Sequence, residues 1–343
     1  AMTLIASGHR TSAGRVISSV FSNYAGFAIR VATTLVTTPL FIKALGQSLY
    51  GSWVLLWSIA AYLTFFDLGI GMAVRKFVAQ AIATGNLGER DRKFNACLSI
   101  YLLISILVVI IGLPVLGLLG NTVGLDTSVR PMIWKISVFL VLDVALAFPL
   151  NAFQGLLTAY QRYELTNAIR VGMEVLRNVF LVVAASLGAD LTALASIQFA
   201  NTLLTLILIW AASVRISRPL KLKLFRLDSS IVHDILSYSG WVAVLSAAQQ
   251  VLNLSSSVLV GYFDTAMVVT EFYVAYRLVS FLVGLPGLMT SVLMPLSSER
   301  DALGDWTSLQ RVFMIGNNAQ ALILAPIAAG AMLLGGEIGR AHV

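Results

Sequence analysis

Several ionisable residues lie inside long apolar stretches of the sequence, where a charged side chain facing lipid would cost a few kcal/mol. Such residues face protein or water instead, and in many membrane proteins they mark substrate or ion pathways. Arginine binds phosphate through paired charge-assisted hydrogen bonds, whereas a carboxylate within a span is suited to proton or cation coupling. The candidate anion-binding residues are Arg30, Arg170, Arg177 and Arg277, and the candidate coupling residues are Asp67, Asp143 and Glu174.

Two of these arginines lie in spans from different halves of the chain. Arg30 lies near the middle of the apolar stretch 16–42, and Arg277 lies about two turns into the eighth apolar stretch. If both side chains reach one water-filled cavity, they can bind a diphosphate between them. Alternatively, Arg30 pairs with Asp67 and Arg277 with Glu271, and each pair simply joins helices. The sequence leaves both interpretations open.

Three charged residues share one face of the predicted fifth span. Arg170, Glu174 and Arg177 are spaced i, i+4 and i+7, so Glu174 can pair with either arginine. One such pairing leaves an excess positive charge, which suits an anionic substrate. Alternatively, the three residues form an ion network buried against a neighbouring helix. Asp67 and Asp143 have a similar pair of interpretations, as coupling carboxylates or as structural partners of neighbouring polar or charged groups.

The composition is that of a membrane protein. Hydrophobic residues make up 58% of the chain and charged residues 11%, and the mean hydropathy is +0.87. Soluble domains average about 25% charged residues. The single cysteine, Cys97, excludes an internal disulfide and a cysteine metal cluster. The three histidines show no metal-binding spacing, and no phosphate-cradling glycine loop precedes a helix, so we predict no cofactor and no metal.

The net charge of +7 and the pI near 9.7 have a membrane explanation. The basic residues lie in short loops between apolar stretches and do not form one patch. We interpret them as orientation signals that face anionic lipid of the cytoplasmic leaflet, and not as a nucleic-acid surface.

Nine apolar stretches are candidates for membrane spans, which need about 20 residues each. They predict an all-α polytopic membrane protein. An amphipathic stretch, 230–238, is expected to lie along the inner interface before the seventh span. The nine stretches are 16–42, 50–84, 94–119, 131–159, 165–187, 191–214, 240–262, 270–296 and 312–334.

The second stretch organises the rest of the chain. The sequence Asp67–Gly71 puts a carboxylate and two glycines at membrane depth and predicts an interruption there. The helix is expected to end at 85–88, and Arg90, Arg92 and Lys93 then follow in a loop. Since basic loops face the cytoplasm, we predict that the amino terminus and the loop 85–93 lie inside.

A weak internal repeat predicts two lobes. Tyr24–Phe27 at the start of the first span resembles Tyr238–Trp241 at the start of the seventh, and the third span resembles the ninth around their prolines. Repeats in this order build many transporters. We expect a six-helix lobe with a basic cytoplasmic linker at 1–228 and a partial second lobe, helices seven to nine, at 229–336.

The heptapeptide Glu337–Val343 has a separate interpretation. It can be encoded by GAG ATC GGA AGA GCA CAC GTC, the read-through sequence of a common sequencing adapter. We expect it to be an artefact; the alternative is a genuine polar tail. In the first case the second lobe lacks its last three or more helices.

Several motifs resemble those of Wzx-type polysaccharide flippases, members of the multidrug/oligosaccharidyl-lipid/polysaccharide exporter superfamily. The resemblance covers nearly the whole chain before the heptapeptide. It implies a MATE-like fold of twelve to fourteen helices in two lobes around a central cavity, often lined with arginines. The matching stretches are Pro39–Leu40, Leu45–Gly46, Tyr50–Trp53, Asp67–Gly71, Gly85–Asn86, Phe272–Arg277 and Met294–Ser297.

These observations predict a flippase and not an enzyme. The expected substrate is an undecaprenyl-diphosphate-linked oligosaccharide, moved across the bacterial inner membrane by alternating access. The expected partners are this substrate and membrane lipids, with a polysaccharide polymerase or ligase as a further candidate. The nearest alternative is a cation-coupled multidrug antiporter of the same superfamily, which would use acidic cavity residues. A membrane glycosyl polymerase or ligase is less favoured, because no outer loop is long enough to carry a catalytic site.

Overall fold

The computed structural model describes residues 25–119, 124–217, 219–225, 228–281, 284 and 305–342, and these residues form helices joined by short connections, without strands. The all-α prediction is therefore confirmed for the described residues. In chain order the helices are 25–45, α2 (Gln47–Ala61), the 3-10 helix η1 (Tyr62–Asp67), α3 (Ile70–Ala83), α4 (Leu87–Leu119), the 3-10 helix η2 (Arg130–Met132), α5 (Ile133–Ala159), α6 (Tyr163–Ser186), α7 (Leu191–Ile216), α8 (Ser229–Phe263), 266–281 and α10 (Trp306–His342).

The helices form two compact units. The larger unit is Leu40–Thr270, and the smaller unit combines Ala1–Pro39 with Glu271–Val343. Helix α8 belongs to the larger unit, where it packs against α2 and α3. The predicted lobes at 1–228 and 229–336 are defined by sequence repetition and not by packing, and they stay a prediction.

Six helices within the described residues are long and apolar enough to cross a membrane. On α4, large apolar side chains are exposed: Leu103, Ile106 and Ile110 are 47%, 56% and 64% exposed. Large apolar side chains exposed in this density need a nonaqueous surrounding. The six helices are Ala25–Leu45, Gln47–Ala83, Leu87–Leu118, Arg130–Ala159, Leu191–Ile216 and Trp306–Gly330.

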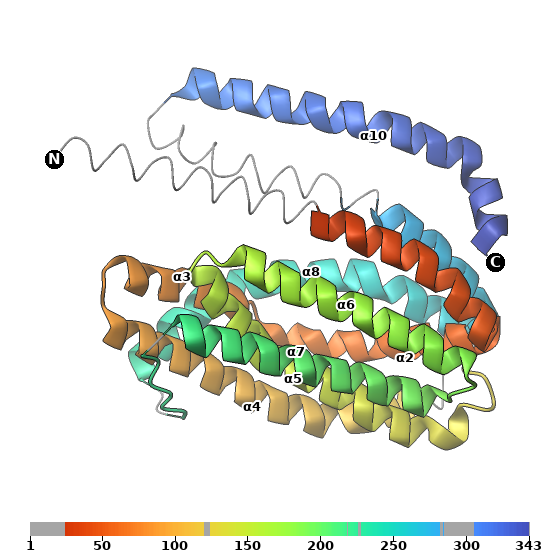
Figure 1. The fold of residues 1–343 in the computed structure, drawn as a ribbon, viewed down its shortest axis with the longest axis horizontal. Helices are drawn as coiled ribbons and strands as arrows, with labels where there is room; N and C mark the ends of the chain where they lie inside the picture. Colours follow the sequence, from red (N-terminus) through yellow and green to blue (C-terminus); the bar gives the residue numbers. More distant parts are fainter. Residues whose placement is uncertain are drawn as a thin grey trace. The chain divides into compact units, whose positions relative to one another are not determined.

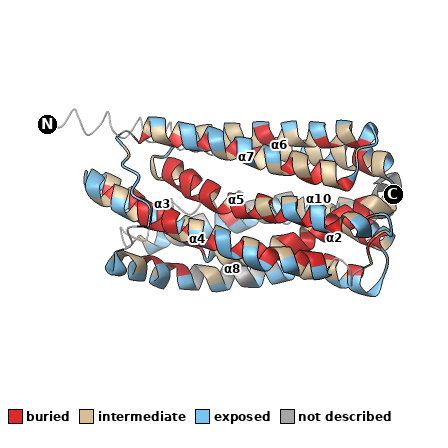
Figure 2. Cartoon of the chain, turned by 90° about the horizontal axis from the view of Figure 1, so that it is seen from below, coloured by how far each residue is buried: buried red, intermediate tan, exposed pale blue. Residues whose placement is uncertain are grey.

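Helix α5 is the central helix of the larger unit. It packs against α3, α4 and α7, and Figure 1 shows it running alongside α4 and α7. Figure 2 shows buried residues along most of its length. Pro149 inside α5 has no N–H for the carbonyl of Ala145, one turn earlier. The Ser105 hydroxyl of α4 donates to this carbonyl at 2.8 Å, so a neighbouring helix replaces the missing hydrogen bond.

The interruption predicted at Asp67–Gly71 is present. Helix α2 tightens into η1, which ends at Asp67, and α3 starts at Ile70. Leu68 and Gly69 between them have positive φ angles of 51° and 73°. Only glycine adopts this conformation without strain, so Gly69 lets the chain turn here while Leu68 carries the cost.

The predicted loop 85–93 is wrong beyond its first residues. Helix α3 ends at Ala83 and α4 already begins at Leu87, so Arg90, Arg92 and Lys93 lie on a helix. The reason is a helix cap. The Asn86 side chain accepts from the backbone N–H of Glu89 at 3.0 Å and donates to the Glu89 carboxylate at 3.2 Å. With 33 residues, α4 is about 50 Å long, longer than the hydrocarbon layer of about 30 Å is thick.

The separate interfacial helix predicted at 230–238 is also wrong. Residues 229–263 form one helix, α8, of 35 residues. Gly240 does not end it, since a single glycine costs only about 1 kcal/mol in a helix. Helix α10 likewise extends past the predicted span 312–334 to His342. The predicted start of the first span, the end of the eighth span and the stretch Met294–Ser297 lie outside the described residues.

Candidate functional site

Asp67 lies at the centre of a polar cluster that joins three parts of the larger unit. Tyr101 on α4 donates its hydroxyl to Asp67 Oδ1 at 2.9 Å, and Asn151 on α5 donates its amide to Oδ2 at 3.0 Å. The Tyr101 side chain is fully buried. A methyl group at Gly71 would lie 3.2 Å from the Tyr101 hydroxyl, so the small residue leaves room for this contact.

The hydrogen bonds at Asp67 leave part of its acceptor capacity open. Its carboxylate is half-buried at the end of η1, directly before the amino terminus of α3. Both hydrogen-bond partners are neutral, and a carboxylate has about four acceptor positions, of which these bonds use two.

A second carboxylate, Asp143, lies on α5 and is only 6% exposed. Gln198 on α7 places its amide nitrogen 3.5 Å from Oδ2, and Thr202 on the same helix lies nearby. Arg177 on α6 lies close enough to interact electrostatically with Asp143. Oδ1 has no hydrogen-bond partner among the described residues. The structure therefore brings two predicted site residues, Asp143 and Arg177, into one cluster with an acceptor left over.

The predicted charged face on the fifth span lies on α6. Arg170 is exposed, and Glu174 and Arg177 are half-buried. Arg177 donates to the neighbouring Asn178 side chain at 3.4 Å. Because α6 packs mainly on α7 and touches α5, Arg177 connects this face to Asp143.

Arg30 and Arg277 both belong to the smaller unit. Arg30 lies half-exposed on the helix 25–45, and Arg277 lies half-exposed on the helix 266–281. The Arg277 guanidinium is 5.5 Å from the ring centroid of Phe281, a cation–π contact one turn along. Their convergence on one diphosphate stays a prediction.

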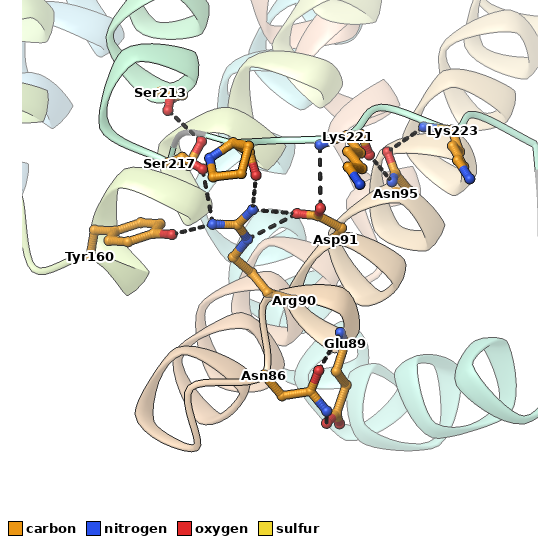
Figure 3. A network of polar contacts seen from close by, with 11 residues as sticks. Asn86, Glu89, Arg90, Asp91, Asn95, Tyr160, Ser213, Ser217, Lys221 and Lys223 are labelled. Atoms are coloured by element: carbon orange, nitrogen blue, oxygen red, sulfur yellow. Dashed lines mark hydrogen bonds and ion pairs between the residues drawn. The ribbon is translucent and has the colours of Figure 1, made fainter.

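The most densely bonded charge of the larger unit is Arg90, near the start of α4 (Figure 3). Its side chain is fully buried. It donates to Asp91 Oδ1 from Nε at 2.9 Å and from Nη2 at 2.6 Å, and to the Tyr160 hydroxyl at 2.6 Å. It also donates to the backbone carbonyls of Ser217 at 2.9 Å and Pro219 at 2.6 Å. All five N–H groups of the guanidinium are therefore used, which makes Arg90 a structural clamp.

Sequence reasoning missed Tyr101, Asn151 and the role of Arg90. Asn151 had a readable signal, since it is a strongly polar residue within an apolar span. Arg90 was interpreted as a loop charge, because its carbonyl partners are more than a hundred residues away in sequence. No group of at least three His, Cys, Asp or Glu side chains that could hold a metal ion occurs in the described part of the chain.

Known structures with this helix arrangement are transporters. A MATE transporter in complex with MaD3S superimposes with a TM-score of 0.67 over 96% of this chain and 75% of that chain, at 16% identity. A MOP superfamily transporter from Pyrococcus furiosus Vc1 gives 0.68 over 96% and 73%, at 16% identity. An inward-facing multidrug resistance MATE family transporter gives 0.67 over 91% and 74%, at 17% identity. The fold is therefore that of a MATE-like transporter, as predicted.

The family follows from the sequence itself. The family of polysaccharide biosynthesis proteins matches residues 16–300, so this chain belongs to that family. No curated relative matches the sequence. The protein is therefore a multi-pass membrane protein of this family with a MATE-like fold, as predicted.

Proposed function

We propose that the protein moves an undecaprenyl-diphosphate-linked oligosaccharide from the inner to the outer face of the bacterial cytoplasmic membrane. The observation that carries this proposal is the match to the polysaccharide biosynthesis family over most of the chain, in a protein with a transporter fold. The substrate has a charged diphosphate that lipid does not dissolve. A basic, water-filled path lowers this barrier while the polyprenyl tail stays in the bilayer.

The intramembrane arginines are the candidate diphosphate ligands. Arg30 and Arg277 are half-exposed helix residues of one compact unit, so neither is sealed in a core. Each guanidinium offers paired donors that match phosphate oxygens. Arg170 and Arg177 on α6 add a second basic face. Weak, shared contacts suit a flippase, since the headgroup has to leave on the far side.

The carboxylates are the candidate coupling groups. Proton binding at Asp67 would change the hydrogen bonds that Tyr101 and Asn151 donate to its carboxylate. Tyr101 lies on α4 and Asn151 on α5. A proton taken up there therefore alters contacts between three helices. Asp143, with its open oxygen and its arginine neighbour, is the second candidate, and Glu174 is the third. Alternating access then follows from a shift between helix packings that these protonation states bias.

A cation-coupled drug antiporter is the second candidate, because the matched structures include a multidrug resistance transporter and the larger unit contains one buried carboxylate, Asp143. Identities of 16–17% to those structures support the fold alone. In the Pyrococcus furiosus transporter, a binding pocket of reverse polarity suggests a different function. In this chain, Arg30, Arg170, Arg177 and Arg277 lie in predicted spans, and for that reason we prefer an anionic substrate to a cationic one.

The test uses cells that lack their own exporter of lipid-linked oligosaccharides. Arg30→Ala, Arg277→Ala and the double variant are expressed at equal protein levels, and surface polysaccharide is measured. We expect about tenfold loss from each single change, because each removes charge-assisted hydrogen bonds to phosphate. Arg277→Lys keeps the charge and tests whether the paired donors matter. Arg130→Ala, an exposed arginine at the start of the short helix η2, is the matched control.

Two results would count against the proposal. Normal polysaccharide export by the double variant would remove Arg30 and Arg277 as diphosphate ligands. Export of cationic dyes by the parent protein, with no effect on polysaccharide, would favour the antiporter.

A further inference from the structure

The connection between α7 and α8 lies along one face of α4. Its backbone forms hydrogen bonds with α4 side chains spaced one helical turn apart. Lys221 donates its backbone N–H to Asp91 at 3.3 Å, and its carbonyl accepts from Asn95 at 2.8 Å. The backbone N–H of Lys223 donates to Asn95 at 3.1 Å, and that of Phe225 to Ser99 at 2.8 Å.

We call residues 219–225 the strap; Arg90 fixes its first part through the carbonyl of Pro219 (Figure 3). Because its contacts to α4 use backbone groups, the strap's side chains are free for other roles. Lys221 and Lys223 alternate along it with Leu222 and Leu224, and all four side chains are exposed.

A cavity of about 550 Å³ opens between the strap, α4 and the first turn of α8. This volume lies in the range of small-molecule sites, about 300–1,000 Å³. Three cations line it: Arg92 from α4, and Lys221 and Lys223 from the strap. None of the three forms an ion pair with a carboxylate among the described residues.

The two carboxylates of the cavity are already engaged. Asp91 binds Arg90 through Oδ1 and the strap backbone through Oδ2. Asp228 caps α8 by accepting from the backbone and hydroxyl of Ser230 at 3.1 and 2.8 Å. These hydrogen bonds, first that of the Ser230 hydroxyl, lower the pKa of Asp228 below its usual value, so it stays a helix cap. Arg92 also interacts electrostatically with Asp228, but none of the three cations forms an ion pair among the described residues, so they are the groups left to meet a ligand.

The apolar side chains beside the cavity indicate where that ligand comes from. Leu222, Leu224 and Phe225 are 43%, 41% and 57% exposed on the strap. Lysines interleaved with exposed leucine and phenylalanine are typical of segments at a membrane surface, where apolar groups enter the headgroup region. The cytoplasmic leaflet carries the anionic lipids that basic pockets between helices bind.

We infer that this cavity is a binding site for the phosphate of an anionic phospholipid of the cytoplasmic leaflet. Arg92, Lys221 and Lys223 hold the phosphate, and the strap's apolar residues lie against the acyl chains. The site is separate from the proposed substrate path, since it uses none of the intramembrane arginines. A bound lipid joins α4 to the strap and to α8, and so stabilises the connection between two long helices.

The test measures binding of phosphatidylglycerol with a fluorescent acyl chain to the purified full chain in a nonionic detergent. Unlabelled phosphatidylglycerol, phosphatidylcholine and inorganic phosphate are the competitors. We expect phosphatidylglycerol to displace the probe, and phosphatidylcholine and about 10 mM phosphate to do so poorly, because the site needs both charge and an apolar anchor. Displacement by phosphate as effective as by phosphatidylglycerol would assign the site to a free anion and overturn the lipid assignment.

Matched variants test whether lipid binding depends on Arg92, Lys221 and Lys223 or on positive charge anywhere on the protein. The triple variant Arg92→Gln, Lys221→Gln, Lys223→Gln is expected to weaken binding at least about tenfold. The control triple Arg75→Gln, Arg162→Gln, Arg215→Gln removes the same charge from exposed residues outside the cavity, and it is expected to weaken binding less than about twofold. Equal losses in the two triples would overturn the proposal.

Two further variants keep the test decisive if the first triple folds poorly. Lys221→Gln alone changes no strap contact, since the strap uses the Lys221 backbone, and it is still expected to weaken binding. Arg92→Lys keeps the charge and is expected to retain most of the affinity. Unchanged binding by Lys221→Gln in a chain with wild-type melting would contradict the site.

Discussion

Arg90 and Asp67 are both charged residues held between helices, but they are held to different degrees. Arg90 is fully buried, and all five of its N–H groups have partners in Asp91, Tyr160 and two backbone carbonyls. Asp67 is half-buried and receives hydrogen bonds from two neutral donors. Arg90 therefore has no N–H group left for a further hydrogen bond, whereas the Asp67 carboxylate has acceptor positions left.

This difference separates a structural charge from a candidate working charge. A group that binds and releases a proton during a transport cycle needs at least two arrangements of similar free energy. Arg90 has only one satisfied arrangement, since any movement of its guanidinium breaks several bonds at once. Asp67 accepts two hydrogen bonds and has acceptor positions left for a further partner. We therefore expect substitutions at Arg90 to affect stability, and substitutions at Asp67 to affect transport per folded molecule.

The largest effect is expected for Arg90→Ala. The change leaves Asp91, Tyr160 and the two carbonyls without their donors, and breaking a buried charge pair costs about 3–5 kcal/mol. We expect the free energy of unfolding of the purified protein to fall by this amount, and the amount of protein in membranes to fall with it. Denaturant titration of the purified protein gives the first quantity, and immunoblotting gives the second.

Arg92→Ala is the matched control for Arg90, because the two residues lie in the same turn of α4 and Arg92 is exposed. It is expected to change the free energy of unfolding in lipid-free detergent by less than about 0.5 kcal/mol. Similar losses at both positions would show that the buried network does not hold this end of the larger unit.

A smaller stability effect, and a larger functional one, is expected at Asp67. Asp67→Ala removes the acceptor of the buried Tyr101 hydroxyl, which costs about 1–3 kcal/mol. Asp67→Asn keeps the shape and should cost less, but it cannot take up a proton. We therefore expect Asp67→Asn to fold at near wild-type levels and to lower export at least about tenfold if proton transfer there is essential. Near-normal export by Asp67→Asn would leave Asp67 as a structural acceptor.

The sequence predicted the all-α fold, but it did not show which charged side chains have all their hydrogen-bonding groups in use. The sequence predicted the interruption near Asp67, because it places a carboxylate and two glycines at membrane depth. It could also have predicted the start of α4, since Asn86 and Glu89 have the spacing of a helix cap. The sequence could not predict the burial of Arg90, because its partners Tyr160, Ser217 and Pro219 come from the ends of other helices. The continuity of α8 depends on packing as well, for example of Tyr238 against Phe77 of α3 at 5.8 Å between ring centroids.

The cap itself provides a prediction of intermediate size. Asn86→Ala removes the acceptor for the Glu89 N–H at the start of α4, and losing such a cap costs about 1 kcal/mol. Arg90 lies in the next turn, so fraying here also loosens its network. We expect a lower free energy of unfolding for Asn86→Ala and little change for Asn86→Asp, which can still cap. An equal loss in both variants would indicate that the cap is not the cause.

The smallest effect is expected at Asp126, whose carboxylate accepts three hydrogen bonds but is far less buried than Arg90. Its carboxylate accepts from the hydroxyls of Ser48 and Ser128, both at 2.6 Å, and from the Ser128 backbone at 2.9 Å. These bonds, first that of the Ser128 hydroxyl, lower the pKa of Asp126 below its usual value. The stabilisation is therefore fully present above the ordinary carboxylate pKa of about 3.9, and it is lost as the pH falls through the lower pKa of the folded protein. Because solvent screens the group, we expect less than about 1 kcal/mol. Melting temperatures between pH 6 and pH 3 should fall slightly less steeply for Asp126→Asn than for the wild type. Identical pH profiles would show that hydrogen bonding without burial contributes nothing measurable here, and burial alone would then explain the strength of the Arg90 clamp.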